Sequence, residues 1–271
     1  MSFSWTCFID ETGDLQNEKA NTSYGMGVYA LPTSSILTVQ NKLKEAKLDN
    51  IHFTNITSFD EKISTLKALA TILNSTPCLL FGISTKDGAF TKDLKNNAEV
   101  GLVLEDKLPY KEVKGIFDKK IDVSRFQWAY KTTLYASLLA ISIKHPKVWK
   151  INLKFSEVGD KKNSIRRNKF FQDNFNKLDS LVWDELKSGL NEKHSLKLKR
   201  PQVSFDFNLD SNEPLQGIAD VASWISGRHL NNLDYNKFYN ELSQYFGRFP
   251  EIIFKDLQKE KGIIVFDGID Y

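Results

Sequence analysis

Three acidic side chains stand where strands or a helix are expected to deliver them to one place. Asp10 ends the first apolar run of the chain, Glu157 follows a later run, and Asp220 lies in a helical pattern that begins at a proline. In an open α/β sheet, ligands bind beyond the carboxyl ends of the strands, and Mg²⁺ and Mn²⁺ prefer carboxylate oxygens. The pattern therefore predicts a Mg²⁺ or Mn²⁺ site, although each acid alone is also typical of a turn or a cap.

The distribution of charge along the chain indicates which class of substrate this candidate metal site could act on. The chain has 271 residues and a net charge of +3, yet residues 144–200 hold 15 basic and 7 acidic side chains, a net charge of +8. Clustered Lys and Arg neutralise the phosphates of nucleic acids. A paired metal site with ions about 4 Å apart can hydrolyse a phosphodiester. Nucleic acid is thus the expected partner, whereas lysine-rich solvated helix faces would produce the same charge count.

The elements that would position these residues alternate between strands and helices. Apolar runs with period 2 or with continuous hydrophobicity predict strands over 3–10, 24–31, 78–84, 148–155, 202–208 and 262–266. Helical spacing and capping residues predict helices over 34–48, 58–73, 124–141, 163–190, 214–225 and 234–246. The first two strands follow each other at hairpin distance and are expected to be antiparallel. This order predicts one α/β domain over 1–271 with a layered sheet.

Two segments fall outside this regular pattern. Residues 85–122 are expected to form an irregular insertion, and residues 231–271 a C-terminal extension with helices. No apolar run approaches the roughly 20 residues that cross a bilayer, and no signal-peptide pattern opens the chain. We therefore expect a cytoplasmic protein without a membrane partner. Cys7 and Cys78 lie in apolar runs without metal-ligand spacing, which predicts buried free thiols.

Two short blocks resemble a known family. Residues 8–14 read FIDETGD and residues 213–220 read EPLQGIAD. They resemble the two signature blocks of the domain of unknown function family 3800, a strand ending Ile-Asp-Glu-Ser-Gly and a helix beginning Leu-Gln-x-Ala-Asp. The resemblance implies an RNase H-like mixed sheet flanked by helices. It also implies a metal-dependent nuclease, because members of the family are predicted nucleases.

The resemblance assigns roles to individual residues. Asp10 becomes the ligand on the first strand and Asp220 the ligand on the helix. Glu157 takes the fourth-strand position, which is usually Asp in RNase H-like sites. Glu11 accompanies Asp10 in the signature but ranks below it, because neighbouring side chains in a strand point to opposite faces. His52 partly matches a Glu-x-His block, which would make it a proton shuttle or a phosphate contact; a lone His is also typical of a surface or core-edge position.

The remaining expectations concern the substrate and the biological setting. Gln216 lies one helical turn before Asp220 and is expected to hold Asp220 or the substrate. The basic side chains expected to flank the cleft are Lys161, Lys162, Arg166 and Arg167. The leading hypothesis is a nuclease of RNA or DNA, in phage defence or a mobile element. The alternatives are a non-catalytic module that binds nucleic acid or protein, and a toxin-like effector. The sheet edges permit a homo-oligomer.

Overall fold

The computed structural model describes most of the sheet and the helices on one side of it. The described residues are 3–12, 24–85, 145–156, 199–209, 213–230, 235–242 and 263–266, with single positions at 133, 137, 138, 141, 142 and 183. The single positions are helical; all but residue 142 fall within two of the expected long helices, and residue 142 directly follows the first of them. The expected insertion at 85–122 lies outside the described residues, apart from residue 85.

A six-stranded mixed sheet forms the centre of the fold. Its strands, in chain order, are β1 (Phe3–Thr12), β2 (Tyr24–Pro32), β3 (Leu79–Thr85), β4 (Val148–Ser156), β5 (Gln202–Leu209) and β6 (Ile263–Phe266), and their spatial order is β5-β4-β1-β2-β3-β6. Antiparallel pairing joins β1 to β2, β2 to β3 and β3 to β6, while β4 runs parallel to both β1 and β5. The predicted antiparallel opening and the α/β class are confirmed.

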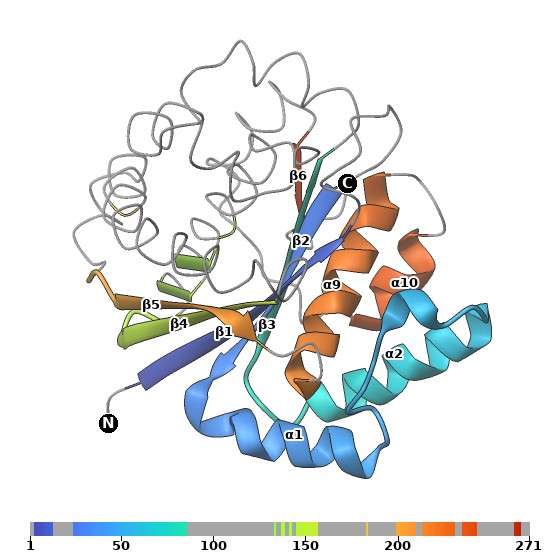
Figure 1. The fold of residues 1–271 in the computed structure, drawn as a ribbon, viewed down its shortest axis with the longest axis horizontal. Coiled ribbons are helices and arrows are strands. Elements are labelled where there is room, and N and C mark those ends of the chain that lie inside the picture. Colours follow the sequence, from blue (N-terminus) through green and yellow to red (C-terminus); the bar gives the residue numbers. More distant parts are fainter. Residues whose placement is uncertain are drawn as a thin grey trace.

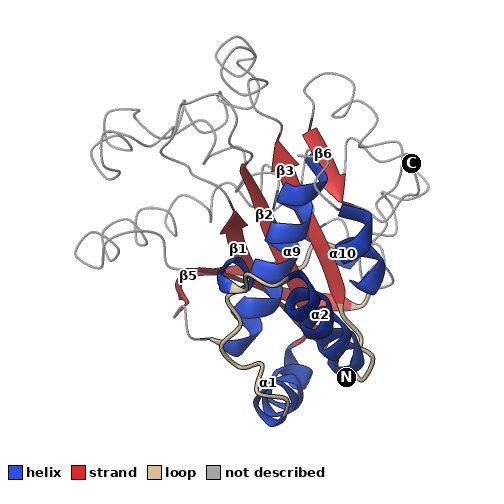
Figure 2. Cartoon of the chain, turned by 90° about the vertical axis from the view of Figure 1, so that its right-hand side faces the viewer, coloured by secondary structure: helices blue, strands red, loops and turns tan. Residues whose placement is uncertain are grey.

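Four helices cover one face of this sheet. They are α1 (Ile36–Glu45), α2 (Phe59–Leu73), α9 (Pro214–Leu230) and α10 (Tyr235–Leu242). Figures 1 and 2 show them together on one side, with α9 lying directly against the strands. The Ser58 side chain accepts a hydrogen bond from the Glu61 backbone N–H, which confirms the predicted N-cap of α2. Pro214 opens α9, as expected of a proline at the first helical position.

The main hydrophobic core lies between the sheet and these helices. Phe8 and Tyr29 of the sheet are fully buried with Leu66 of α2 and Ile218 of α9. Side chains alternate along β1, so Trp5, Cys7 and Ile9 point to the other face, where they are buried as well. Both faces of β1 are therefore covered, as in a central strand of a layered α/β domain.

Helix α9 makes an unusually close approach to the sheet at Gly27 of β2. A methyl group added to Gly27 would overlap the carbonyl oxygen of Ala219 and the backbone nitrogen of Ser223. These two atoms lie on either side of Asp220 along α9, and Gly27 is the register partner of Asp10 on β1. The missing side chain of Gly27 thus lets α9 lie against the strand that pairs with the Asp10 position.

Two further expectations concerned the state of the cysteines and the presence of membrane-spanning helices. Cys7 is buried and Cys78 is half-buried, and both are free thiols as predicted. Burial raises the pKa of the Cys78 thiol to about 12, so this thiol stays protonated at neutral pH. Among the described residues, none of the helices combines the length and the apolar character that crossing a membrane requires.

Candidate active site

Asp10 lies near the end of β1 on the face that packs against α9. It shares this face with Phe8, because successive strand side chains alternate. Its carboxylate is half-buried and accepts hydrogen bonds from the side chains of Ser156 and Gln216 and from the Glu11 backbone. These bonds hold the carboxylate at the junction of β1, β4 and α9.

Asp220 reaches the same place from α9. Its Oδ2 accepts a hydrogen bond of 2.7 Å from the backbone N–H of Phe53, in a short 3₁₀ helix (η2, Phe53–Asn55). Phe53 is fully buried and packs edge-on against Trp224 of α9, with ring centroids 4.9 Å apart. The Nζ of Lys62 lies 5.3 Å from both ring centroids. This aromatic contact anchors the N–H that orients the Asp220 carboxylate.

Burial raises the pKa of both carboxyl groups, and the charge of Asp10 also acts on Asp220. Burial raises the pKa of Asp220 to about 6, and the negative charge of Asp10 adds to the increase. Burial also raises the pKa of Asp10 above its ordinary value, against the opposing effect of its hydrogen bonds. His52 lowers the pKa of both carboxyl groups through its charge. The structure therefore brings together the predicted residues Asp10, Asp220 and His52.

Gln216, in the first turn of α9, also belongs to the site formed by Asp10, Asp220 and His52. Its Nε2 donates a hydrogen bond of 2.7 Å to the carbonyl oxygen of Ile9, which fastens α9 to β1 next to Asp10. The side chain is 4% exposed, and its Oε1 is buried without a hydrogen-bond partner within the described part of the chain. A buried carbonyl oxygen without a donor is uncommon in folded proteins. It is a neutral oxygen on the side chain that also donates a hydrogen bond to Asp10.

Ser156 is the residue of this site that the sequence analysis did not single out. The parallel register pairs Ile9 with Phe155, so the next residues, Asp10 and Ser156, lie side by side on the same face. Glu157, the acid predicted at this strand end, is the next residue along the chain and lies outside the described residues. The polar Ser156 at the end of an apolar strand was the signal that could have identified this contact.

The other predicted residues are placed differently. Strand β1 continues through Thr12, so Glu11 is still within the strand and its side chain faces away from the Asp10 face. His52 is exposed and directly precedes η2, at the solvent side of the carboxylate pair. Lys161, Lys162, Arg166 and Arg167 lie outside the described residues. Within the described ranges, no group of three or more His, Cys, Asp or Glu side chains is arranged to hold a metal ion.

A polar strip continues from this site across β4 and β5. Asn152 and Lys154 share the Ser156 face of β4, and Ser204 Oγ donates a hydrogen bond of 2.7 Å to Asn152 Oδ1. The Lys154 Nζ lies 5.8 Å from the centroid of the Phe8 ring, on the same side of the sheet as the carboxylates. These side chains are half-buried. The strip therefore offers hydrogen-bond donors and a positive charge beside the carboxylate pair.

Comparison with known proteins found no matching family model and no matching curated protein. The candidate site is thus defined by the residues and contacts described above.

Proposed function

We propose that this protein is a metal-dependent nuclease of RNase H-like fold that hydrolyses phosphodiester bonds of RNA or DNA. The observation that carries the proposal is the convergence of Asp10 and Asp220, from a central strand and a C-terminal helix, on one half-buried position. The mixed sheet, with an antiparallel meander that continues into parallel strands, is compatible with this fold. The resemblance of residues 8–14 and 213–220 to a nuclease-like family supports the same proposal.

The residues present fit a divalent cation of the Mg²⁺ or Mn²⁺ type. Asp10 and Asp220 supply carboxylate oxygens, and the unpartnered Oε1 of Gln216 supplies a carbonyl oxygen. Hard cations prefer such all-oxygen sets. The raised pKa values indicate a site that gains from added positive charge. A bound cation would supply water activation and stabilisation of the leaving oxygen.

The surrounding residues would orient the carboxylates and the substrate. The Phe53 N–H and the Ser156 hydroxyl hold the two carboxylates in place. Exposed His52 is suited to exchange a proton with the substrate or to contact a phosphate. Lys154, on the polar strip, is suited to contact the nucleic-acid backbone, as is the basic segment 144–200 of which it is part.

The direct test is cleavage of labelled single- and double-stranded RNA and DNA by the purified full-length chain. Cleavage is expected with Mn²⁺ or Mg²⁺ and not with EDTA. Asp10→Asn should remove it, while Asp60→Asn, which changes an exposed acid in the first turn of α2, should retain it. Nucleic-acid binding that needs no divalent ion, with no cleavage under any of these conditions, would favour the non-catalytic module instead.

A second prediction concerns Gln216 and metal affinity. Gln216→Met should lower Mn²⁺ affinity about tenfold, because it removes one proposed oxygen ligand and the hydrogen bonds to Ile9 and Asp10. Its effect on metal-free stability should stay within about 2 kcal/mol, since removal of an unpaired buried oxygen offsets part of the two lost hydrogen bonds. Calorimetric titration with Mn²⁺ and urea unfolding measure the two effects. Unchanged Mn²⁺ affinity would exclude Gln216 as a ligand.

A further inference from the structure

A pocket lies at the end of the sheet opposite the candidate active site, and the proposed function makes no use of it. It has a volume of about 350 Å³ and is lined by residues from the start of β1, the end of β2 and the turn that leads into β4. Trp5 and Asp10 are both on β1 but point to opposite faces and lie near opposite ends of the strand. A molecule in this pocket would therefore not occupy the carboxylate site.

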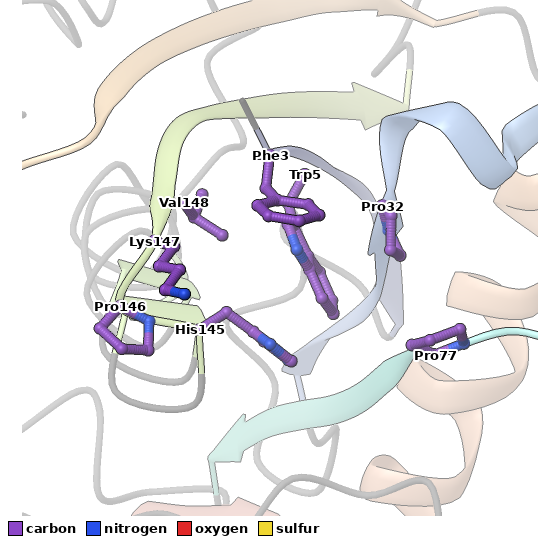
Figure 3. Close-up of a pocket in the computed structure, with 8 residues that line it drawn as sticks. All are labelled: Phe3, Trp5, Pro32, Pro77, His145, Pro146, Lys147 and Val148. Carbon is purple, nitrogen blue, oxygen red and sulfur yellow. The ribbon is translucent and has the colours of Figure 1, made fainter. Parts of the chain in front are cut away.

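The walls of the pocket are rigid and mostly apolar. Pro32, Pro77 and Pro146 each have a ring that fixes the local backbone, and Figure 3 shows Pro146 on one side and Pro32 and Pro77 on the other. The Val148 N–H donates a hydrogen bond of 2.9 Å to the His145 carbonyl, which closes a tight turn with Pro146 at its second position. The cavity is thus largely preformed, which lowers the entropy cost of binding.

Aromatic side chains form the centre of the pocket. The Trp5 indole and the His145 imidazole are stacked, with ring centroids 4.4 Å apart and planes at 29°. Phe3 lies beside them and is 47% exposed, a high value for a large apolar side chain next to a cavity. Trp5 is buried beneath this surface, so a flat aromatic molecule would pack against Phe3 and the prolines. The volume is near the lower end of the range of about 300–1,000 Å³ found for small-molecule sites.

The charge of the lining residues favours a negatively charged ligand. Lys147 carries a positive charge and is exposed. None of the eight residues that line the pocket in the described part of the chain is acidic. Figure 3 shows Lys147 on the same side of the pocket as Pro146, close to His145. We propose that this pocket binds a small aromatic carboxylate, with its ring against the exposed Phe3 and the prolines and its carboxylate toward Lys147.

The test uses 2-naphthoate as the probe, with the neutral 2-naphthalenemethanol and the cationic 2-naphthylmethylamine as comparators. Calorimetric titration of the full chain should give an affinity for 2-naphthoate about tenfold higher than for the alcohol, since one charge-assisted contact is worth about that factor. The amine should bind most weakly. Equal affinities for carboxylate and alcohol, or no binding of the carboxylate at millimolar concentration, would overturn the proposal.

Charge reversal at Lys147 tests whether the probe binds in this pocket. Lys147 is exposed, so Lys147→Glu is expected to fold, and it should weaken 2-naphthoate binding at least about tenfold. Lys44→Glu, the same change at an exposed position on α1 outside the pocket, is the matched control and should leave the affinity unchanged. Phe3→Ala should weaken binding several-fold, and Asp10→Asn should not affect it. Retained binding in Lys147→Glu would place the probe elsewhere.

Discussion

Asp220→Asn is expected to abolish the proposed nuclease activity and, at the same time, to stabilise the metal-free protein. Activity should fall by about 1,000-fold or more, because loss of a ligand of the proposed metal would remove several kcal/mol of transition-state stabilisation. Stability at pH 7 should increase by about 2–3 kcal/mol, the amount that corresponds to moving the pKa of Asp220 from 3.8 to about 6. The amide oxygen can still accept the hydrogen bond from the Phe53 N–H.

The pH dependence of wild-type stability follows from the same shift. Between about pH 4 and pH 6 the folded protein retains a proton on Asp220 that the unfolded chain has released. Because the folded state binds more protons in this window, the free energy of unfolding decreases as the pH rises through it. Above the folded pKa of about 6 the contribution of Asp220 levels off. Asp220→Asn removes this contribution, so its stability should depend less on pH over the window.

Urea unfolding in EDTA at several pH values from 4 to 8 measures both effects. Asp60→Asn serves as the control, because Asp60 is exposed and lies outside the carboxylate pair. Mn²⁺ should stabilise the wild type in proportion to its binding and should stabilise Asp220→Asn far less. If Asp220→Asn is as stable as the wild type at pH 7, or less stable, the pKa of Asp220 is not raised in the folded protein as described.

Gly27→Ala is expected to destabilise the protein by about 3 kcal/mol or more, at the upper end of overpacking effects. The added methyl group would meet the backbone of α9 at Ala219 and Ser223, so a change of side-chain rotamer could not relieve the overlap. Helix α9 would have to move away from β2, and Asp220 would move with it. We therefore expect a loss of activity at temperatures where the variant remains folded.

Gly217→Ala provides the matched control on α9. A methyl group at Gly217 would lie 2.8 Å from the carbonyl oxygen of Ile51, in a loop outside the sheet. The better helix propensity of alanine, about 1 kcal/mol, offsets part of this overlap. Urea unfolding of both variants should show the larger loss for Gly27→Ala. Similar losses would mean that the approach of α9 to β2 is not the tighter contact.

The sequence was informative where one periodic pattern determined the position of a residue. The alternation in residues 3–10 and the proline at the start of α9 located Asp10 and Asp220 on their elements. Their proximity was an inference from strand ends, and the effect of the Asp10 charge on the pKa of Asp220 supports it. The Ser156 contact depends on the parallel register of β1 and β4, which hydrophobic patterns do not determine.

Contacts that a backbone atom of one element makes with a different element could not be predicted from the sequence either. The Phe53 N–H that binds Asp220 belongs to a three-residue 3₁₀ helix without a periodic signal. Gly27 looked like an ordinary strand glycine, and only the packing of α9 gives it a specific role. The lack of a hydrogen-bond partner for Gln216 Oε1 likewise can be recognised only from the positions of the neighbouring donors.

The two carboxylates are far apart in the sequence, and this separation has a consequence for the chain during its translation. The hydrogen bonds that build the site span 167 residues, from Phe53 to Asp220, and 207 residues, from Gln216 to Ile9. Such contacts close very large loops and are expected to form late in folding. A growing chain on the ribosome carries Asp10 for most of its translation without Asp220. A nascent or truncated chain therefore holds only half of the carboxylate pair, and the proposed function implies that such a chain could not cleave RNA before α9 has emerged.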